Sequence, residues 1–299
     1  MMIVLFLFLL GLAFGSFLNV LTLRYKPDES YGIKTVGGRS HCLHCGRQLR
    51  WFELIPLLSF IIQRGACRAC GKKLSWQYPL VELAAGLIFV TVPLFFQQHA
   101  LLWGISQQPV LVVLFSALWI GVLFLLLAMC IIDLRWYVIP NVLNEILAFL
   151  GVCWIGIITL THLAGSIGTG SFLGNFSQLF PLVGSLLYIN HLWGILIAGV
   201  FFLVVVLVSR GKGMGMGDVK LIAVLGLLFG WPDILLIIML SFIIGTVVVV
   251  PLMVIRKKKM SDKIPFGPFI VIASAIVFFF GSGIVTSYFA IIQRIVGGS

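Results

Sequence analysis

Long apolar segments recur along the chain, and most have the length of a membrane-spanning helix. A hydrocarbon core about 30 Å thick requires about 20 consecutive apolar residues when a helix crosses it. Transmembrane strands alternate apolar and polar positions, whereas residues 110–132 are almost continuously apolar. The pattern predicts an all-α polytopic membrane protein with about eight transmembrane helices. These helices are expected at residues 2–23, 80–96, 110–132, 140–161, 192–209, 219–231, 234–255 and 266–292.

Composition excludes a soluble globular protein. Of the 299 residues, 61% are hydrophobic and 10% are charged, whereas soluble domains carry about 25% charged residues. The polar surface is therefore too small to face water on all sides. The first apolar segment lacks a preceding basic flank and a following small-residue cleavage site, so we expect a retained helix rather than a signal peptide.

The distribution of basic residues predicts the orientation in the membrane. The chain has 20 Lys and Arg against 9 Asp and Glu, a net charge of +11. Lys and Arg resist translocation and collect in short inside loops. The bilayer thus accounts for the basic excess, and no nucleic-acid partner is expected. With the N-terminus outside, 19 of the 20 basic residues lie at Lys220 or in the inside segments, residues 24–79, 133–139, 210–218 and 256–265.

Three segments need separate interpretation. Residues 219–231 would form a helix of about 20 Å, which is shorter than the hydrocarbon core. We nevertheless expect a crossing, because a re-entrant loop would move the basic residues 256–259 to the outside. That basic run is interpreted as an anchor near anionic headgroups. Residues 176–189 are interrupted by Pro181 and Gly184, and they are expected to form an interfacial segment in an outside loop.

Four cysteines in the polar segment 24–79 predict a metal site. Cys42 and Cys45 form one Cys-x-x-Cys pair, Cys67 and Cys70 form a second, and 21 residues separate the pairs. Two such turns, each followed by a glycine, can complete a tetrahedral four-thiolate zinc site. Disulfides are the alternative, but the predicted cytoplasmic location disfavours them. We therefore divide the chain into a first helix (1–23), a small cytoplasmic zinc-binding module (24–79) and a seven-helix membrane domain (80–299).

The acidic residues are few enough to consider singly. Five of them are expected to be solvated in loops or turns: Asp28, Glu29, Glu53, Asp233 and Asp262. Four lie at or within helix ends, where an ionisable group is costly and often functional: Glu82, Asp133, Glu145 and Asp218.

Asp133 and Asp218 are both predicted at the inner membrane boundary. Glycines at 213, 215 and 217 would let backbone or substrate approach Asp218 closely. The structural alternative is that Asp218 caps its helix and that Asp133 pairs with Arg135.

Together these motifs give the chain a family resemblance. With these motifs in this order, the chain resembles bacterial type IV prepilin peptidases, which are membrane aspartyl proteases of the Gly-x-Gly-Asp type. The matching stretches are Gly15-Ser-Phe-Leu-Asn19, Ile55-Pro56-Leu-Leu-Ser59, the two cysteine pairs, Tyr78-Pro79-Leu-Val-Glu82, Asp133 with Ile139-Pro140-Asn141, Gly215-Met-Gly217-Asp218 and Pro265-Phe-Gly-Pro268.

The resemblance implies two activities in the bacterial cytoplasmic membrane. The family's catalytic aspartates map onto Asp133 and Asp218, which would cut the basic leader of prepilins and pseudopilins after a glycine. Members with the cysteine-bearing loop then methylate the new N-terminal amine from S-adenosylmethionine. Glu53 and Glu82 lie near the cysteines and are candidates for binding the amine or this cofactor. Glu82 has the alternative of a helix-end charge held by a nearby lysine.

Two other interpretations remain open at this point. The first keeps the peptidase and makes the four-cysteine loop purely structural. The second is a non-enzymatic membrane scaffold or transporter in which the zinc module docks a cytoplasmic partner. A transporter would favour charges near the bilayer midplane and internally repeated halves, and the sequence shows neither.

Overall fold

The computed structural model describes residues 2–27, 38–101, 103–105, 107–163, 171–173, 187–211, 213–255 and 264–296. Within these ranges the regular structure is helical, without β-strands, as predicted. The helices are α1 (Met2–Arg24), η2 (Trp51–Leu54), α2 (Leu58–Ile62), α3 (Gln77–Gln98), α4 (Pro109–Trp136), α5 (Asn141–Leu163), α6 (Leu187–Val208), α7 (Met216–Phe229), α8 (Asp233–Val254) and α9 (Gly267–Val296). The predicted interfacial segment at 176–189 lies largely outside these ranges, and Asp28, Glu29, Asp262 and the basic run 256–259 lie wholly outside them.

Seven described helices are long and apolar enough to cross a membrane, and among the eight predicted crossings α7 is the exception. At 14 residues it would extend about 21 Å. The chain after α7 nevertheless lies beside the start of α6. The evidence is a hydrogen bond of 2.9 Å from the Trp231 N–H to the Asn190 carbonyl. The short helix therefore runs antiparallel to α6 along most of its length.

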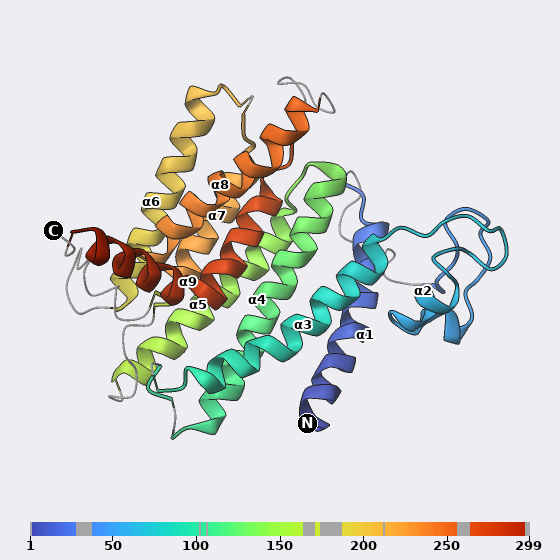
Figure 1. The fold of residues 1–299 in the computed structure, drawn as a ribbon, viewed down its shortest axis with the longest axis horizontal. Helices are drawn as coiled ribbons and strands as arrows, with labels where there is room; N and C mark the ends of the chain where they lie inside the picture. The colour runs from blue at the N-terminus through green and yellow to red at the C-terminus, as the bar shows by residue number, and fades with distance from the viewer. Residues whose placement is uncertain are drawn as a thin grey trace.

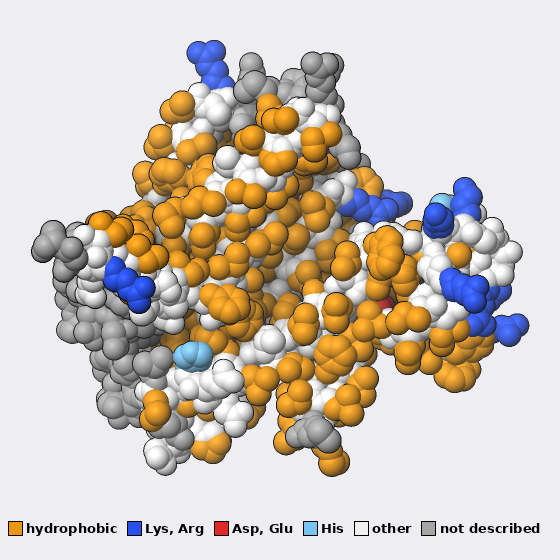
Figure 2. Space-filling model, in the orientation of Figure 1, with side chains coloured by type: hydrophobic (Ala, Val, Ile, Leu, Met, Phe, Trp, Pro, Cys, Tyr) orange, Lys and Arg blue, Asp and Glu red, His pale blue; other side chains and the backbone are white. Residues whose placement is uncertain are grey.

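The long helices form a bundle, and residues 38–76, which contain the four cysteines and are called the cysteine segment below, project from one side (Figure 1). In that view α6 and α8 end at the upper edge, α1 rises from the N-terminus at the lower edge, and it ends beside the projecting segment. The face of the bundle in view is largely hydrophobic, while Lys and Arg side chains are concentrated on the projecting segment and are sparse elsewhere (Figure 2). A hydrophobic face of this kind is suited to contact with lipid.

Aromatic side chains fill the centre of the bundle. Trp119 of α4 is fully buried. Its ring centroid lies 5.5 Å from that of Trp154 in α5 and 5.1 Å from that of Phe229 in α7. Phe278 of α9 packs on the same indole at 4.8 Å. These contacts fix α7 between the longer helices, and they thereby fix the position of its first turn.

Glycines permit the closest helix crossings. A Cβ at Gly194 in α6 would collide with the carbonyl oxygen of Gly226 in α7, and the reverse also holds. On α1, a Cβ at Gly15 would lie 2.8 Å from the Cα of Glu82 in α3. Small residues at such crossings let membrane helices pack by direct backbone contact.

The cysteine segment contains the same turn twice. The amide of Cys42 donates to the Arg47 carbonyl, and the amide of Cys67 donates to the Lys72 carbonyl, both at 2.9 Å. The glycine after each pair, Gly46 or Gly71, has a left-handed backbone with φ of +70° or +66°. Each turn therefore presents two thiols from a backbone that glycine adopts without strain.

Asp233 is not solvated, so that prediction is wrong. It is fully buried as the first residue of α8. Its carboxylate accepts hydrogen bonds from the Ser171 hydroxyl at 2.5 Å and the Phe172 amide at 2.7 Å. The loop 171–173 folds back onto the start of α8, and the buried carboxylate satisfies donors that would otherwise lack partners.

Candidate functional site

Asp133 lies in the last turn of α4, where its side chain is buried. Tyr137 caps the helix just after its last residue, adopts a left-handed conformation and donates its amide to the Asp133 carbonyl. The Asp133 carboxylate accepts a hydrogen bond from the Gly267 amide at 3.0 Å. Asp133 thus joins the end of α4 to the start of α9.

Asp218 lies in the first turn of α7 and is also buried. Its Oδ2 accepts the amide of Gly215 at 3.1 Å, so it caps the helix from the third position rather than from the N-cap itself. The alternative role in helix capping therefore coexists with any chemical role. The alternative for Asp133 was an ion pair with Arg135. Arg135 instead donates to the Leu23 carbonyl at 3.3 Å, and its guanidinium lies over the Trp136 ring.

The two aspartates come together although 85 residues separate them. Two contacts place the end of α4 and the turn that follows it beside the start of α7, so both buried carboxyl groups lie at the same junction of helices. The turn after α4 packs on the start of α7, since a Cβ at Gly217 would lie 3.2 Å from Ile139 Cβ. A second link is the hydrogen bond at 2.9 Å from Lys220 Nζ to Asn141 Oδ1. Like charges held in a buried site cannot both ionise easily, which is the arrangement that acid–base chemistry uses.

Gly267 is a site residue to which the sequence assigned no role. A Cβ at this position would lie 2.5 Å from Asp133 Oδ2, closer than real Cβ contacts come. The motif Pro265-Phe-Gly-Pro268 signals the residue, but its function becomes visible only when α9 is placed beside α4. Glu145, the fourth helix-end acid, is exposed on α5.

The four predicted metal ligands form one cluster. The Sγ atoms of Cys42, Cys45, Cys67 and Cys70 all lie within 4.8 Å of one another. The amides of Cys70 and Ala69 lower the pKa of Cys67 to about 6. For Cys70 two effects compete. The hydrogen bond from the Lys72 amide lowers the pKa, but burial and the neighbouring thiols together raise it to about 11. Four sulfur donors in this space fit a tetrahedral zinc ion and leave no open position.

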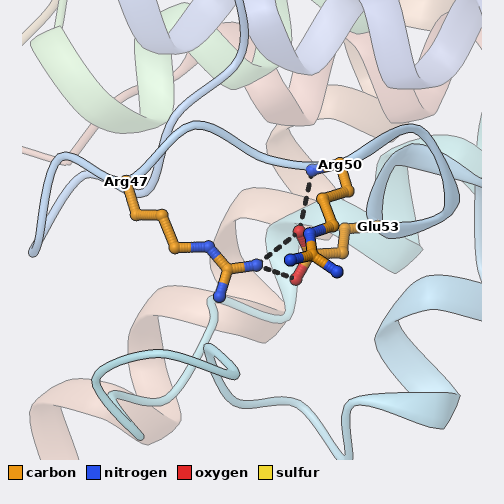
Figure 3. A network of polar contacts seen from close by, with 3 residues as sticks. All are labelled: Arg47, Arg50 and Glu53. Carbon is orange, nitrogen blue, oxygen red and sulfur yellow. Dashed lines mark hydrogen bonds and ion pairs between the residues drawn. The ribbon is translucent and has the colours of Figure 1, made fainter.

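Glu53 is buried rather than solvated, which corrects the expectation for this acid. Its two carboxylate oxygens each lie 2.8 Å from Arg47 Nη2, and Oε2 also accepts the Arg50 amide at 2.8 Å (Figure 3). The Arg50 amide, together with the Arg47 guanidinium, lowers the pKa of Glu53. This acid therefore holds the first cysteine turn against η2.

Glu82 connects the membrane bundle to the cysteine segment. It is buried in α3, and its Oε2 accepts the Leu57 amide at 2.9 Å. Both Glu53 and Glu82 line a cavity of about 420 Å³ that α1, α3 and the cysteine segment enclose. The two acids predicted near the cysteines therefore reach the same cavity, one ion-paired and one bound to a backbone amide.

Comparison with known proteins places these features in a family. The model of the bacterial Peptidase A24 N-terminal domain matches residues 9–96, and that of the type IV leader peptidase family matches residues 120–250. A prepilin leader peptidase/N-methyltransferase of Stutzerimonas stutzeri is 33% identical over 93% of this chain and 91% of its own. The chain belongs to the type IV leader peptidase family.

Other relatives of this leader peptidase family member carry the same name. The protein of Pseudomonas aeruginosa is 31% identical over 94% of this chain and 91% of its own. The protein of Aeromonas hydrophila is 30% identical over 94% of this chain and 92% of its own. No solved structure matches the chain. The family and the enzyme class predicted from the motifs are confirmed, and with seven apolar helices they indicate a multi-pass protein of the inner membrane.

Proposed function

We propose that this leader peptidase family member cleaves type IV prepilins and pseudopilins after a glycine and then methylates the new N-terminal amine. The names of its relatives support both reactions. The observation that supports the peptidase half is that the end of α4 and the start of α7, which carry the buried Asp133 and Asp218, pack against each other. The partners are the membrane-anchored substrate and the bilayer.

The proposed cleavage uses the two carboxyl groups in different protonation states. One carboxylate takes a proton from a water as that water attacks the scissile carbonyl carbon. The other, protonated, donates a hydrogen bond to the oxyanion that develops. Each aspartate has one oxygen held by a backbone amide, from Gly267 or Gly215. We assign the second oxygen of each to the water and the substrate.

The proposed orientation puts the aspartates at the cytoplasmic boundary of the membrane, the cysteine segment in the cytoplasm and the N-terminus outside. The clustering of 19 of the 20 basic residues supports it. The return of the chain by α7 to the start of α6 supports counting this short helix as a crossing. A substrate with a basic cytoplasmic leader and an apolar stem would then present its cleavage point at the level of Asp133.

Gly267→Ala is expected to slow cleavage about tenfold or more, because the new methyl group must displace the Asp133 carboxylate or the start of α9, an overpacking cost of about 1–3 kcal/mol. Gly283→Ala on the same helix is the matched control, since a Cβ there meets nothing within 4 Å. The measurement is the initial rate of prepilin cleavage in detergent or liposomes. Equal rates for the two variants would contradict the proposed contact.

We assign zinc to the four cysteines, where it would stabilise the segment without entering the reaction. S-adenosylmethionine supplies the methyl group when bound. Glu53 and Glu82 both line the cavity beside the cysteines, and the residues that line this cavity do not include Asp133 or Asp218. The two reactions are therefore proposed to occur at separate sites, with the processed N-terminus moving between them.

One assay tests both halves of the proposal. Purified protein is incubated with a prepilin and S-adenosylmethionine carrying a labelled methyl group. We expect a shortened pilin that contains the label at its N-terminus. Cleavage without label would support a peptidase with a purely structural loop, and the absence of cleavage would support the scaffold interpretation.

A further inference from the structure

The cavity between the cysteine segment and the bundle has the dimensions of a small-molecule site. Its volume of about 420 Å³ lies within the range of about 300–1,000 Å³ that ligand pockets occupy. Ser16 and Asn19 of α1 and Tyr78 and Glu82 of α3 line it from the membrane side. The cysteine segment lines the opposite side, so a bound molecule would touch both parts.

Asn19 leaves a buried acceptor without a partner in this cavity wall. Its side chain is 1% exposed, and its Nδ2 donates to the Tyr78 carbonyl at 3.1 Å. Because a carbonyl only accepts, the amide orientation is fixed and Oδ1 is the free atom. Among the described residues Oδ1 has no hydrogen-bond partner. Buried acceptors without partners are rare and costly, and a ligand is one way to satisfy them.

Glu82 lies on the same wall as Asn19. Gly15, one helical turn before Asn19, packs directly on the Glu82 backbone, and residues four apart share a helix face. The Glu82 carboxylate receives the Leu57 amide at Oε2. A carboxylate and an amide oxygen together favour a ligand with N–H donors and positive charge.

Glu53 does not fit the role of a ligand residue. Its carboxylate is already shared by Arg47 and the Arg50 amide. A positioning role, in which it holds the opposite wall in place, explains its burial without a ligand. Of the two acids predicted to bind the cofactor, the geometry therefore favours Glu82.

We propose that S-adenosylmethionine binds in this cavity and that its amine hydrogens are donated to Asn19 Oδ1 and the Glu82 carboxylate. The proposal rests on the methyltransferase half of the proposed function and adds its location and two binding residues. The unpartnered Asn19 oxygen shows that the residues present fit a donor-rich cofactor.

The test measures binding directly, by calorimetry of S-adenosylmethionine with the full-length, metal-loaded protein in detergent. Asn19→Leu and Glu82→Gln are expected to weaken binding about tenfold or more, as loss of a hydrogen bond to a charged ligand does. Thr22→Val on α1 is the control for Asn19, because the Thr22 hydroxyl bonds within its own helix and does not line the cavity. Prepilin cleavage by each variant verifies that the bundle is folded.

In a second pair of variants, both substitutions are made in the cysteine segment and none in the helix bundle. Gln63→Trp would fill the cavity from the cysteine segment, while Gln48 lies in the same segment, is exposed and is not among the residues that line the cavity, so Gln48→Trp is the control. Loss of binding in Gln63→Trp alone, with cleavage retained, supports the proposal. Equal binding by all variants would place the cofactor elsewhere and overturn it while leaving the proposed function intact. A wild-type protein that cleaves but neither binds nor transfers the methyl donor would overturn both the site and the methyltransferase half.

Discussion

Asp133→Asn and Asp218→Asn are each expected to reduce prepilin cleavage about a thousandfold or more, since each removes either the general base or the donor to the oxyanion. An asparagine can still accept the Gly267 or Gly215 amide that now holds the carboxylate. The local backbone is therefore expected to stay in place while the proton transfer is lost. The measurement is the cleavage rate of a purified prepilin under single-turnover conditions.

Glu145→Gln is the matched control for the aspartate variants. It removes an acid from the second turn of α5, close in sequence to the Asn141 side chain that contacts α7, but Glu145 is exposed. Its cleavage rate should equal that of the wild type. Methylation of a synthetic peptide that already has the mature N-terminus should persist in both aspartate variants, which would show that they are folded. Full cleavage activity in either variant would remove that residue from the mechanism.

The helical architecture was predictable because the bilayer imposes it. Apolar segments must satisfy their backbone groups internally, so length and composition locate the helices. The exception is α7, whose 14 residues are too few for its role to follow from length. Its position depends on the Gly194–Gly226 crossing and on Phe229 packing against Trp119, which are contacts between distant parts of the chain.

Candidate site residues were predictable where their chemistry is conspicuous. The cysteine pairs follow from local spacing, and they cluster as expected. Asp133 and Asp218 stand out because acids are scarce in this chain. Asp233 and Glu53 were misjudged, since a carboxylate near a predicted loop looks solvated until its buried partners are known. Asn19 and Gly267 lie in recognisable motifs, but their roles depend on neighbours 59 and 134 residues away.

Removing the metal is expected to abolish methyl transfer while leaving prepilin cleavage intact. The cysteine segment has two helices, η2 and α2, each shorter than six residues, and so small a unit usually needs a metal to fold. Structural zinc binding contributes on the order of 10 kcal/mol to folding. Loss of the metal would unfold the cysteine segment, which forms the wall of the cavity opposite Asn19 and Glu82. The aspartates lie in the bundle, whose packing does not include the metal.

Two treatments make this prediction sharp. The first treatment is chelation of the metal, and the second is the double substitution Cys42→Ser with Cys67→Ser, which removes the two buried ligands. The control is Cys153→Ala in α5, which removes a cysteine outside the cluster. Metal content, methyl transfer and cleavage are measured on the same preparations. Methyl transfer by protein that elemental analysis shows to be free of metal would contradict the structural role of the cysteines. Loss of cleavage along with methylation would mean that the segment also supports the bundle, through contacts such as Glu82 with the Leu57 amide. The variant Glu82→Leu, which cannot accept the Leu57 amide, would then reproduce part of that loss with the metal still bound, and this separates the contribution of the contact from that of the zinc site.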